Sequence, residues 1–206
     1  LSVISGFARL NGYPVIILAN NPQVYGGGWT SSASKKIIKI IDLAQTFHFP
    51  ILNFVDNPGF VIGTHAEKSA TIKYGAKALA AIYQLKVPIC SIILRKVFGV
   101  AGAAHMNHTK YKYRIAWPSA DWGSLPFEGG IEAAYKSELN KSKDPKKLAK
   151  EIHDRLNLAT SPFKTAEKFL IEDIIDPRDT RKKACDWIKL AFKKLKIGPS
   201  AFGFRP

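Results

Sequence analysis

The chain has 206 residues, which is long enough for one large domain or two small ones with a substantial buried core. Its hydrophobic share of 46% and charged share of 23% are ordinary for a globular protein, and no apolar run approaches the roughly 20 residues of a membrane-spanning helix. The net charge of +15 raises nucleic acid, a membrane surface or a phosphorylated ligand as partners. Because lysine supplies most of this charge and is spread along the chain, a solvated basic surface explains it better.

The two cysteines, Cys90 and Cys185, fall in a predicted strand and a predicted helix and form no metal-ligand spacing. We therefore expect reduced cysteines, no metal site and a cytoplasmic protein. The first residues contain neither an initiator methionine nor a signal-peptide core, which suggests a fragment or a processed product.

The first predicted element is a β-hairpin from Phe7 to Leu18, because Asn11-Gly12 suits a type I′ turn between β-forming residues. A helix is predicted from Lys35 to Phe47, with Ser34 as its N-cap. The core face of this helix is expected to consist of Ile37, Ile41, Ala44 and Phe47.

Two apolar runs, Pro50 to Val55 and Val87 to Leu94, are predicted to be buried strands of one parallel sheet. The helix between them is predicted from Ser69 to Leu85, within a connection long enough for a right-handed crossover. Its core face is expected to consist of Ile72, Ala76, Leu79 and Tyr83. Ligands collect beyond the carboxyl ends of parallel strands, so the loops Asp56 to Phe60 and Phe98 to Ala103 are predicted to line one site.

The second of these loops is rich in small residues and then turns helical, which leaves free N–H groups at the start of a helix. Such groups bind an anion or a polarised carbonyl oxygen, and in an enzyme they form an oxyanion hole. A tight turn whose small residues serve only packing is the alternative. Asp56 is expected to satisfy loop amides rather than transfer protons, and His105 to be structural rather than a metal ligand.

Further along, a short strand is predicted from Tyr113 to Pro118 and a helix from Gly130 to Asn140. Asp144 is expected to cap a helix that reaches about Leu158. A short helix is predicted from Thr165 to Phe169.

A last helix is predicted from Arg181 to Lys194. It faces the core with Ala184, Trp187 and Ala191. No repeat unit or linker is visible, so residues 1–206 are predicted to form a single α/β domain.

A series of short motifs runs through nearly the whole chain. In order, they are Gly6 to Arg9 with Asn11-Gly12, Phe54 to Phe60 (F-V-D-N-P-G-F), Gly63-Thr64, Gly75 to Lys77, Arg95 to Gly99 (R-K-V-F-G), Ala116 to Ala120 and Asp173 to Arg181. This ordered set resembles the C-terminal half of the biotin-dependent acyl-CoA carboxyltransferases, the family of the propionyl-CoA carboxylase β-chain. The resemblance implies a crotonase-like fold, a β-β-α superhelix, in place of a doubly wound sheet.

The resemblance also implies a reaction, in which a carboxyl group moves from N1 of carboxybiotin to the α-carbon of an acyl-CoA of the acetyl or propionyl class. In the family the C-terminal half holds biotin and the N-terminal half holds CoA. The implied partners are a biotin carboxylase and biotin carboxyl carrier subunit, the chain's own N-terminal half and further copies in a homo-oligomer. No nucleic acid or membrane is implied, and this chain alone is expected to be inactive.

Site residues follow from the resemblance by position. The implied oxyanion donors for biotin are the backbone N–H groups of Val100 and Ala101. Gly99 would permit the turn, and Gly59 and Phe60 would form the facing loop. The implied biotin-binding set is Gly59, Phe60, Gly99 and Gly102.

The chain departs from the family pattern beside these donors. The family commonly has Gly-Gly-Ala-Tyr where this chain has Gly99 to Gly102, and Ala103 stands where the family has an acidic residue. These departures bear on substrate choice more than on fold. Two other functions remain open: a biotin-dependent acyl-CoA decarboxylase subunit of the same family, and a basic module that binds nucleic acid or an anionic surface.

Overall fold

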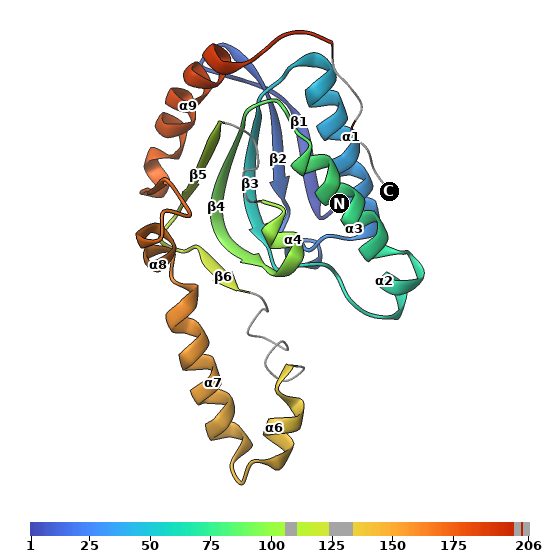
Figure 1. Ribbon diagram of the computed structural model, residues 1–206, viewed down its shortest axis with the longest axis vertical. Helices are drawn as coiled ribbons and strands as arrows, with labels where there is room; N and C mark the ends of the chain where they lie inside the picture. Colours follow the sequence, from blue (N-terminus) through green and yellow to red (C-terminus); the bar gives the residue numbers. More distant parts are fainter. Residues whose placement is uncertain (106–110, 124–133, 200–202, 204–206) are drawn as a thin grey trace.

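The computed structural model describes residues 1–105, 111–123, 134–199 and 203. Its centre is a seven-stranded sheet in the order β1-β2-β3-β4-β5-β7, with β6 paired to the last residues of β4 (Figure 1). The strands are β1 (Val3–Leu10), β2 (Tyr13–Asn20), β3 (Ile51–Asn57), β4 (Ile89–Phe98), β5 (Lys112–Ala116), β6 (Asp121–Gly123) and β7 (Asp173–Ile174). β1 and β2 are antiparallel, and the other pairs are parallel.

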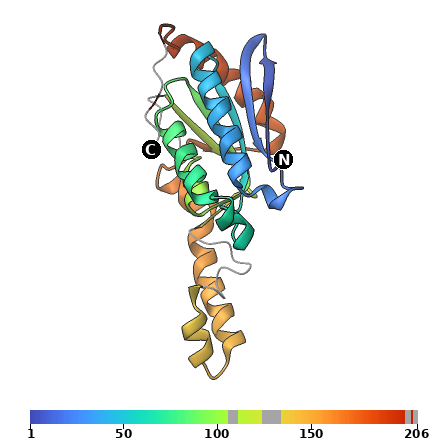
Figure 2. The same ribbon diagram turned by 90° about the vertical axis from the view of Figure 1, so that its right-hand side faces the viewer.

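Helices cover both faces of the sheet, α1 (Ser31–Phe47) and α3 (Thr71–Tyr83) on one side and α9 (Thr180–Lys194) on the other (Figures 1 and 2). The remaining described helices are η1 (Tyr25–Gly27), α2 (Thr64–Lys68), α4 (Gly99–Ala103), α6 (Lys136–Lys141), α7 (Pro145–Thr160), α8 (Pro162–Glu167) and η2 (Pro177–Asp179). Successive residues of β3 enter opposite cores, Ile51 the one under α1 and Leu52 the one under α9. This double burial confirms the prediction of an α/β sheet with apolar central strands.

The N-terminal hairpin is confirmed, and it is longer than predicted. Asn11 and Gly12 form its turn with φ values of 51° and 85°, as a type I′ turn requires. Pro14 pairs with Arg9 of β1 and precedes Ile16, the first residue of β2 in register with β3. Its missing N–H therefore falls where the ladder to β3 has not begun.

Helix α1 begins earlier than predicted. Its N-cap is Thr30, whose side-chain oxygen accepts a hydrogen bond from the Ala33 N–H, while Ser34 lies fully buried inside the helix. Phe47, predicted in the core, is 61% exposed. At about 100° per residue the last position has rotated roughly 90° away from the face of Ile37, so Phe47 leaves the core.

Helix α3 is rotated relative to the predicted face. Ile72 and Tyr83, both expected in the core, are 55% and 44% exposed, and Ala76 is exposed as well. The buried residues are instead Thr71, Gly75, Ala78, Ala81 and Ile82. Small residues bring α3 close to its neighbours, since a Cβ on Gly75 would meet the Phe60 ring at 2.4 Å.

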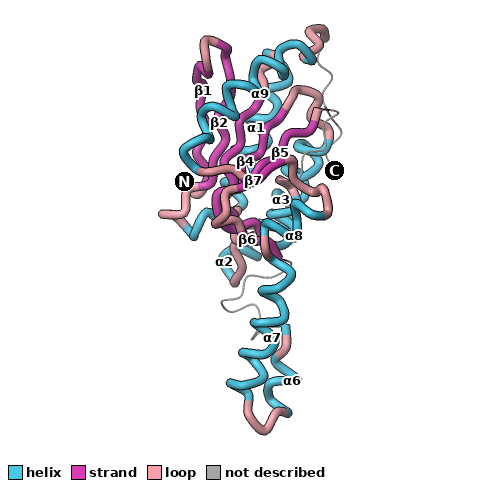
Figure 3. The backbone as a smooth tube through the Cα atoms, turned by 90° about the vertical axis from the view of Figure 1, so that its left-hand side faces the viewer, coloured by secondary structure: helices cyan, strands magenta, loops and turns pink. Residues whose placement is uncertain are grey.

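The C-terminal part carries a helical extension. Helices α6 and α7 pack on each other and project away from the sheet (Figures 1 and 3). Asp144 caps α7 by accepting a hydrogen bond from the Lys147 N–H, as predicted, whereas α8 ends before the predicted Phe169. The predicted helix from Gly130 to Asn140 lies partly outside the described residues.

The predicted core face of α9 is confirmed, because Ala184, Trp187 and Ala191 are at most 2% exposed. No described helix is long and apolar enough to cross a membrane. The single-domain organisation over residues 1–206 stays a prediction.

Candidate functional site

The ends of β3 and β4 lie side by side, because the two strands are parallel and Asn57 is in register with Val97. The loop from Asp56 to Phe60 and helix α4 therefore emerge at the same edge of the sheet. A Cβ placed on Gly59 would lie 3.7 Å from the Phe98 carbonyl oxygen, which shows how closely the two segments face each other. Their predicted adjacency is confirmed, while the roles assigned to their residues stay predictions.

Helix α4 begins with a sharp turn. Phe98 is extended at the N-cap, and Gly99 has a φ of 62°, which glycine adopts without strain. The N–H groups of Gly99, Val100 and Ala101 have no acceptor inside the helix, because no helical carbonyl lies four residues before them. The Val100 side chain is 61% exposed, and Ala101 is fully buried. The predicted donors thus occupy the first turn of a helix that a buried strand presents.

The facing loop is held in place by backbone bonds to Trp29. The Trp29 N–H donates to the Gly59 carbonyl and the Val61 N–H donates to the Trp29 carbonyl, both at 3.0 Å. The Gly59 N–H donates to Asn57 Oδ1 at 2.9 Å. Gly59 has a φ of 123°, a backbone conformation that glycine adopts without strain.

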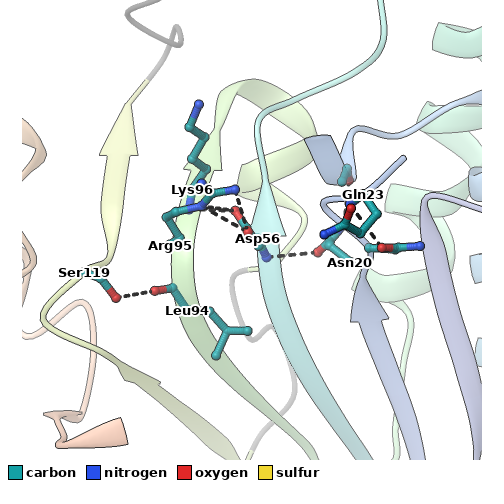
Figure 4. A network of polar contacts seen from close by, with 9 residues as sticks. Asn20, Gln23, Asp56, Leu94, Arg95, Lys96 and Ser119 are labelled. Carbon is teal, nitrogen blue, oxygen red and sulfur yellow. Dashed lines mark hydrogen bonds and ion pairs between the residues drawn. The ribbon is translucent and has the colours of Figure 1, made fainter. Parts of the chain in front are cut away.

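Asp56 joins the two strand ends (Figure 4). Its carboxylate accepts hydrogen bonds from the Lys96 backbone N–H at 3.1 Å and from Arg95 Nε at 3.2 and 3.3 Å. Its own N–H donates to Asn20 Oδ1 at 3.3 Å. Because Asp56 is 6% exposed and fully engaged by neighbouring donors, it satisfies amides as predicted.

His105 lies behind the loop, 3% exposed, with its ring edge-on to Trp29. Nδ1 lies 3.0 Å from Asn53 Nδ2, and Nε2 lies 3.0 Å from Asn57 Nδ2. Burial and, to a smaller extent, the charge of Arg114 lower the pKa of His105 from 6.5 to about 3. The ring is therefore neutral at physiological pH and carries one proton.

The neighbours of His105 decide which nitrogen carries that proton. Asn57 Oδ1 is occupied by the Gly59 N–H, so its Nδ2 donates to His105 Nε2. The ring proton then sits on Nδ1, which needs an acceptor from Asn53. A half-turn of the Asn53 amide supplies it: Oδ1 then faces His105 Nδ1, and Nδ2 takes the place where Oδ1 has no partner among the described residues.

A cavity of about 450 Å³ opens beside α4. Its lining comes from the end of β4, α4, β5, β6 and the segment around α8, and consists of Val97, Gly99, Gly102, Ala103, Arg114, Trp122, Gly123, Lys164, Thr165, Lys168 and Leu170. Of the predicted site residues it includes Gly99 and Gly102, and it does not include Val100, Ala101, Gly59 or Phe60. Phe60 instead packs its ring against Trp29 and Gly75.

The charged wall of this cavity did not emerge from the sequence pattern. Arg114 is 6% exposed and its guanidinium lies 5.6 Å from the centre of the Trp122 ring. Burial lowers the pKa of Arg114 to about 10, and the Glu172 carboxylate opposes this shift, so the side chain stays charged at neutral pH. The available signal was an arginine inside a short strand, directly before the apolar residues Ile115 and Ala116.

Other candidate residues lie elsewhere. Trp117 donates from its indole N–H to Thr180 Oγ1 and packs in the core under α9. Cys90 and Cys185 are both free, as expected. Among the described residues, no group of histidine, cysteine and acidic side chains is arranged to hold a metal ion.

Comparison with known proteins identifies relatives along nearly the whole chain. The propionyl-CoA carboxylase carboxyltransferase subunit of Haloferax mediterranei is 33% identical over 200 residues, which are 96% of this chain and 39% of the relative. The methylmalonyl-CoA carboxyltransferase 12S subunit of Propionibacterium freudenreichii is 31% identical over 97% of this chain and 38% of its own length. The chain thus spans about two fifths of the length of these relatives.

Solved structures agree with this picture. A transcarboxylase 12S crystal structure, a hexamer with methylmalonyl-coenzyme A and methylmalonic acid bound, matches all of this chain with a TM-score of 0.86 and 30% identity, over 40% of its own chain. The crotonase-like fold is thereby confirmed. In sequence, residues 1–201 match the protein-family model of the carboxyl transferase domain. The chain is a member of the carboxyl transferase domain family, similar to the C-terminal part of propionyl-CoA carboxylase β-chains.

Proposed function

We propose that this chain is the biotin-binding half of an acyl-CoA carboxyltransferase, which transfers a carboxyl group from N1-carboxybiotin to the α-carbon of an acyl-CoA. The match of residues 1–201 to the carboxyl transferase domain carries this proposal. The substrate class, the acetyl and propionyl type, rests on the propionyl-CoA carboxylase relatives. The proposed location is the cytoplasm, in keeping with two free cysteines.

The first turn of α4 suits biotin as a cofactor, supplied on a partner carrier domain. A ureido ring is neutral and offers one strong acceptor oxygen, and the N–H groups of Val100 and Ala101 have no acceptor in the helix. Small residues, among them Gly99 and Gly102, line the adjoining cavity and leave room for a ring. Bound carboxybiotin would supply an activated carboxyl group. The two N–H groups would hold the ureido oxygen and favour negative charge that develops on it.

The proposed partners follow from the same relatives. They are a biotin carboxylase and biotin carboxyl carrier subunit, the N-terminal half of the carboxyltransferase, and further copies in an oligomer. The similar transcarboxylase 12S protein is a hexamer within a multienzyme core, which supports an oligomer. The methylmalonyl-CoA decarboxylase subunit alpha of Propionigenium modestum, 32% identical over 187 residues, supports the reverse reaction as a second candidate.

Removing one donor tests the site. Proline is tolerated in the first turn of a helix, so Val100→Pro deletes an N–H, whereas the matched control Val100→Ala keeps it. In the complete polypeptide that contains this chain, carboxyl transfer between carboxybiotin and propionyl-CoA should fall about 100- to 1,000-fold in Val100→Pro and stay near wild type in Val100→Ala. Full transfer by a folded Val100→Pro protein would refute the donor assignment.

The division of labour between halves is tested by this chain alone. Incubated with carboxybiotin and acetyl- or propionyl-CoA, it should show no turnover, because the proposed CoA-binding half is absent. Strong turnover by the isolated chain would contradict the proposal that it supplies only the biotin half.

A further inference from the structure

The cavity beside α4 contains two buried N–H donors without an acceptor. Arg114 Nε and Trp122 Nε1 make no hydrogen bond to any described part of the chain. Both side chains line the cavity, and Arg114 is 6% exposed. A buried donor left without an acceptor costs about 1–3 kcal/mol, and more when the group is charged, so each of these atoms is a candidate donor to a water or a ligand.

The charge of the lining selects the kind of partner. Three cations line the cavity, Arg114, Lys164 and Lys168, and no acidic residue is among its described lining residues. The lysines are exposed at the rim, whereas the arginine is inside. Glu172 accepts the Arg114 backbone N–H, and its charge acts on the Arg114 guanidinium. An anion would therefore be attracted to the rim and paired with Arg114 inside.

We propose that this cavity is a carboxylate-binding site, in which Arg114 and Trp122 donate hydrogen bonds to the carboxylate oxygens and Lys164 and Lys168 attract the anion. A carboxylate fits because it is planar and offers two oxygens, one for each unpartnered donor. The guanidinium fork suits this geometry better than a lysine would. This site goes beyond the backbone donors of α4, because Val100 and Ala101 are not among the residues that line the cavity.

Two sources can bring a carboxylate here: a small free carboxylate, and the carboxyl group of a carboxyl-bearing acyl thioester. The second source rests on the proposed function, since it assumes that an acyl-CoA reaches this cavity. Direct binding of a carboxylate to this chain tests the carboxylate site independently of the proposed function, because binding requires no carboxyl transfer.

The first experiment titrates the ¹⁵N-labelled chain with malonate at constant ionic strength and follows the Trp122 indole N–H and the Arg114 Nε–H by NMR. Both resonances should shift and saturate. Arg114→Met should weaken binding about tenfold or more, because it removes the charge and the donor but keeps the aliphatic stem. The paired change Lys164→Ala with Lys168→Ala should weaken binding a few-fold, most at low salt. The paired change Lys146→Ala with Lys147→Ala, an equal charge change on exposed α7, should leave the Kd unchanged.

Clear results overturn the proposal. Absence of any shift at the Trp122 indole refutes it, as does an unchanged Kd in Arg114→Met, or inorganic phosphate binding as tightly as malonate. If Arg114→Met does not fold, Trp122→Phe provides the test, because it keeps an aromatic ring and deletes the indole N–H. Malonate binding, followed at the Arg114 Nε–H, should then weaken. An unchanged Kd in Trp122→Phe would refute the proposed carboxylate site.

The source of the bound carboxylate is assigned by adding different ligands and following the same two N–H resonances. Shifts with acetate and bicarbonate support a site for free carboxylates. Shifts with malonyl-pantetheine but not acetyl-pantetheine support a site for a carboxyl-bearing acyl group. Because Val100→Pro tests the proposed function by transfer and leaves the Arg114 wall intact, failure of one proposal is distinguishable from failure of the other.

Discussion

The 3-10 helix η1 approaches the end of β3 so closely that one added methyl group should disturb both. Gly27 has a φ of 87°, and a Cβ at this position would lie 2.2 Å from the Asp56 carbonyl oxygen. Asp56 is the residue that joins β3 to β4 through Lys96. Gly27→Ala therefore strains the backbone at one place and pushes the candidate site loop at another.

The magnitude has two parts. Holding alanine at a left-handed φ costs about 1–2 kcal/mol. Overpacking against backbone, which cannot rotate away as a side chain could, adds about 1–3 kcal/mol. We expect Gly27→Ala to lower the free energy of unfolding by about 2–5 kcal/mol in total, a large share of the roughly 5–15 kcal/mol that stabilises a domain.

Gly12→Ala is the matched control. Gly12 has nearly the same φ, 85°, but a Cβ there meets nothing within 4 Å. Chemical unfolding followed by circular dichroism should thus show a loss of about 1–2 kcal/mol for Gly12→Ala. The difference between the two variants isolates the contact with Asp56. Equal losses in both variants would refute the reasoning, because they would leave the close approach without any energetic effect.

Other expectations concern the neighbouring contacts. Asp56→Ala should lower the free energy of unfolding by about 1–3 kcal/mol, because it removes the carboxylate that accepts the part-buried Lys96 backbone N–H. Arg95→Ala removes the half-exposed partner of the same carboxylate and should cost under about 1 kcal/mol. The reverse order in chemical unfolding would contradict this assignment. The pKa of His105 is lower in the folded protein than the unfolded value of 6.5, so the stability that neutral His105 contributes is complete above pH 6.5 and is lost toward pH 3 by roughly 1 kcal/mol per pH unit. Chemical unfolding across this pH range should show that slope. An identical slope in His105→Gln would exclude His105 as its cause. Trp187→Ala should lower the free energy of unfolding by about 3–5 kcal/mol and the exposed Leu190→Ala by under about 0.5 kcal/mol, with similar losses contradicting the packing of α9.

The central sheet and the position of the site were predictable from local pattern. Apolar runs bounded by glycine-bearing loops predicted β3 and β4, because strands buried on both faces need no alternation. Parallel pairing then required the segments after Val55 and Leu94 to meet at one edge. This inference depended on connection length and strand ends, which the sequence displays directly.

The rotation of helices and the charged wall were less predictable, because they depend on packing between distant segments. In α3 the larger residues Ile72 and Tyr83 face outward, since contact with neighbouring elements favours small residues such as Gly75. Sequence periodicity cannot distinguish two faces that differ by one residue when both contain apolar side chains. Likewise Arg114, Trp122 and the α8 lysines become neighbours only after β5, β6 and α8 assemble.

The two walls of the cavity are built for different kinds of interaction. The α4 wall is neutral, because His105 behind the facing loop holds a single proton and its partners are amides. The N–H groups of the first turn of α4 are fixed in direction by Gly99, and the facing loop is fixed by Trp29, so the proposed donors would meet developing charge without reorganising. The wall that contains Arg114 carries positive charge in this arginine and in two exposed lysine side chains, which suits the proposed binding of a full negative charge. A ligand that is polar at one end and anionic at the other would use both walls, and the paired tests of Val100→Pro and Arg114→Met separate the contribution of each.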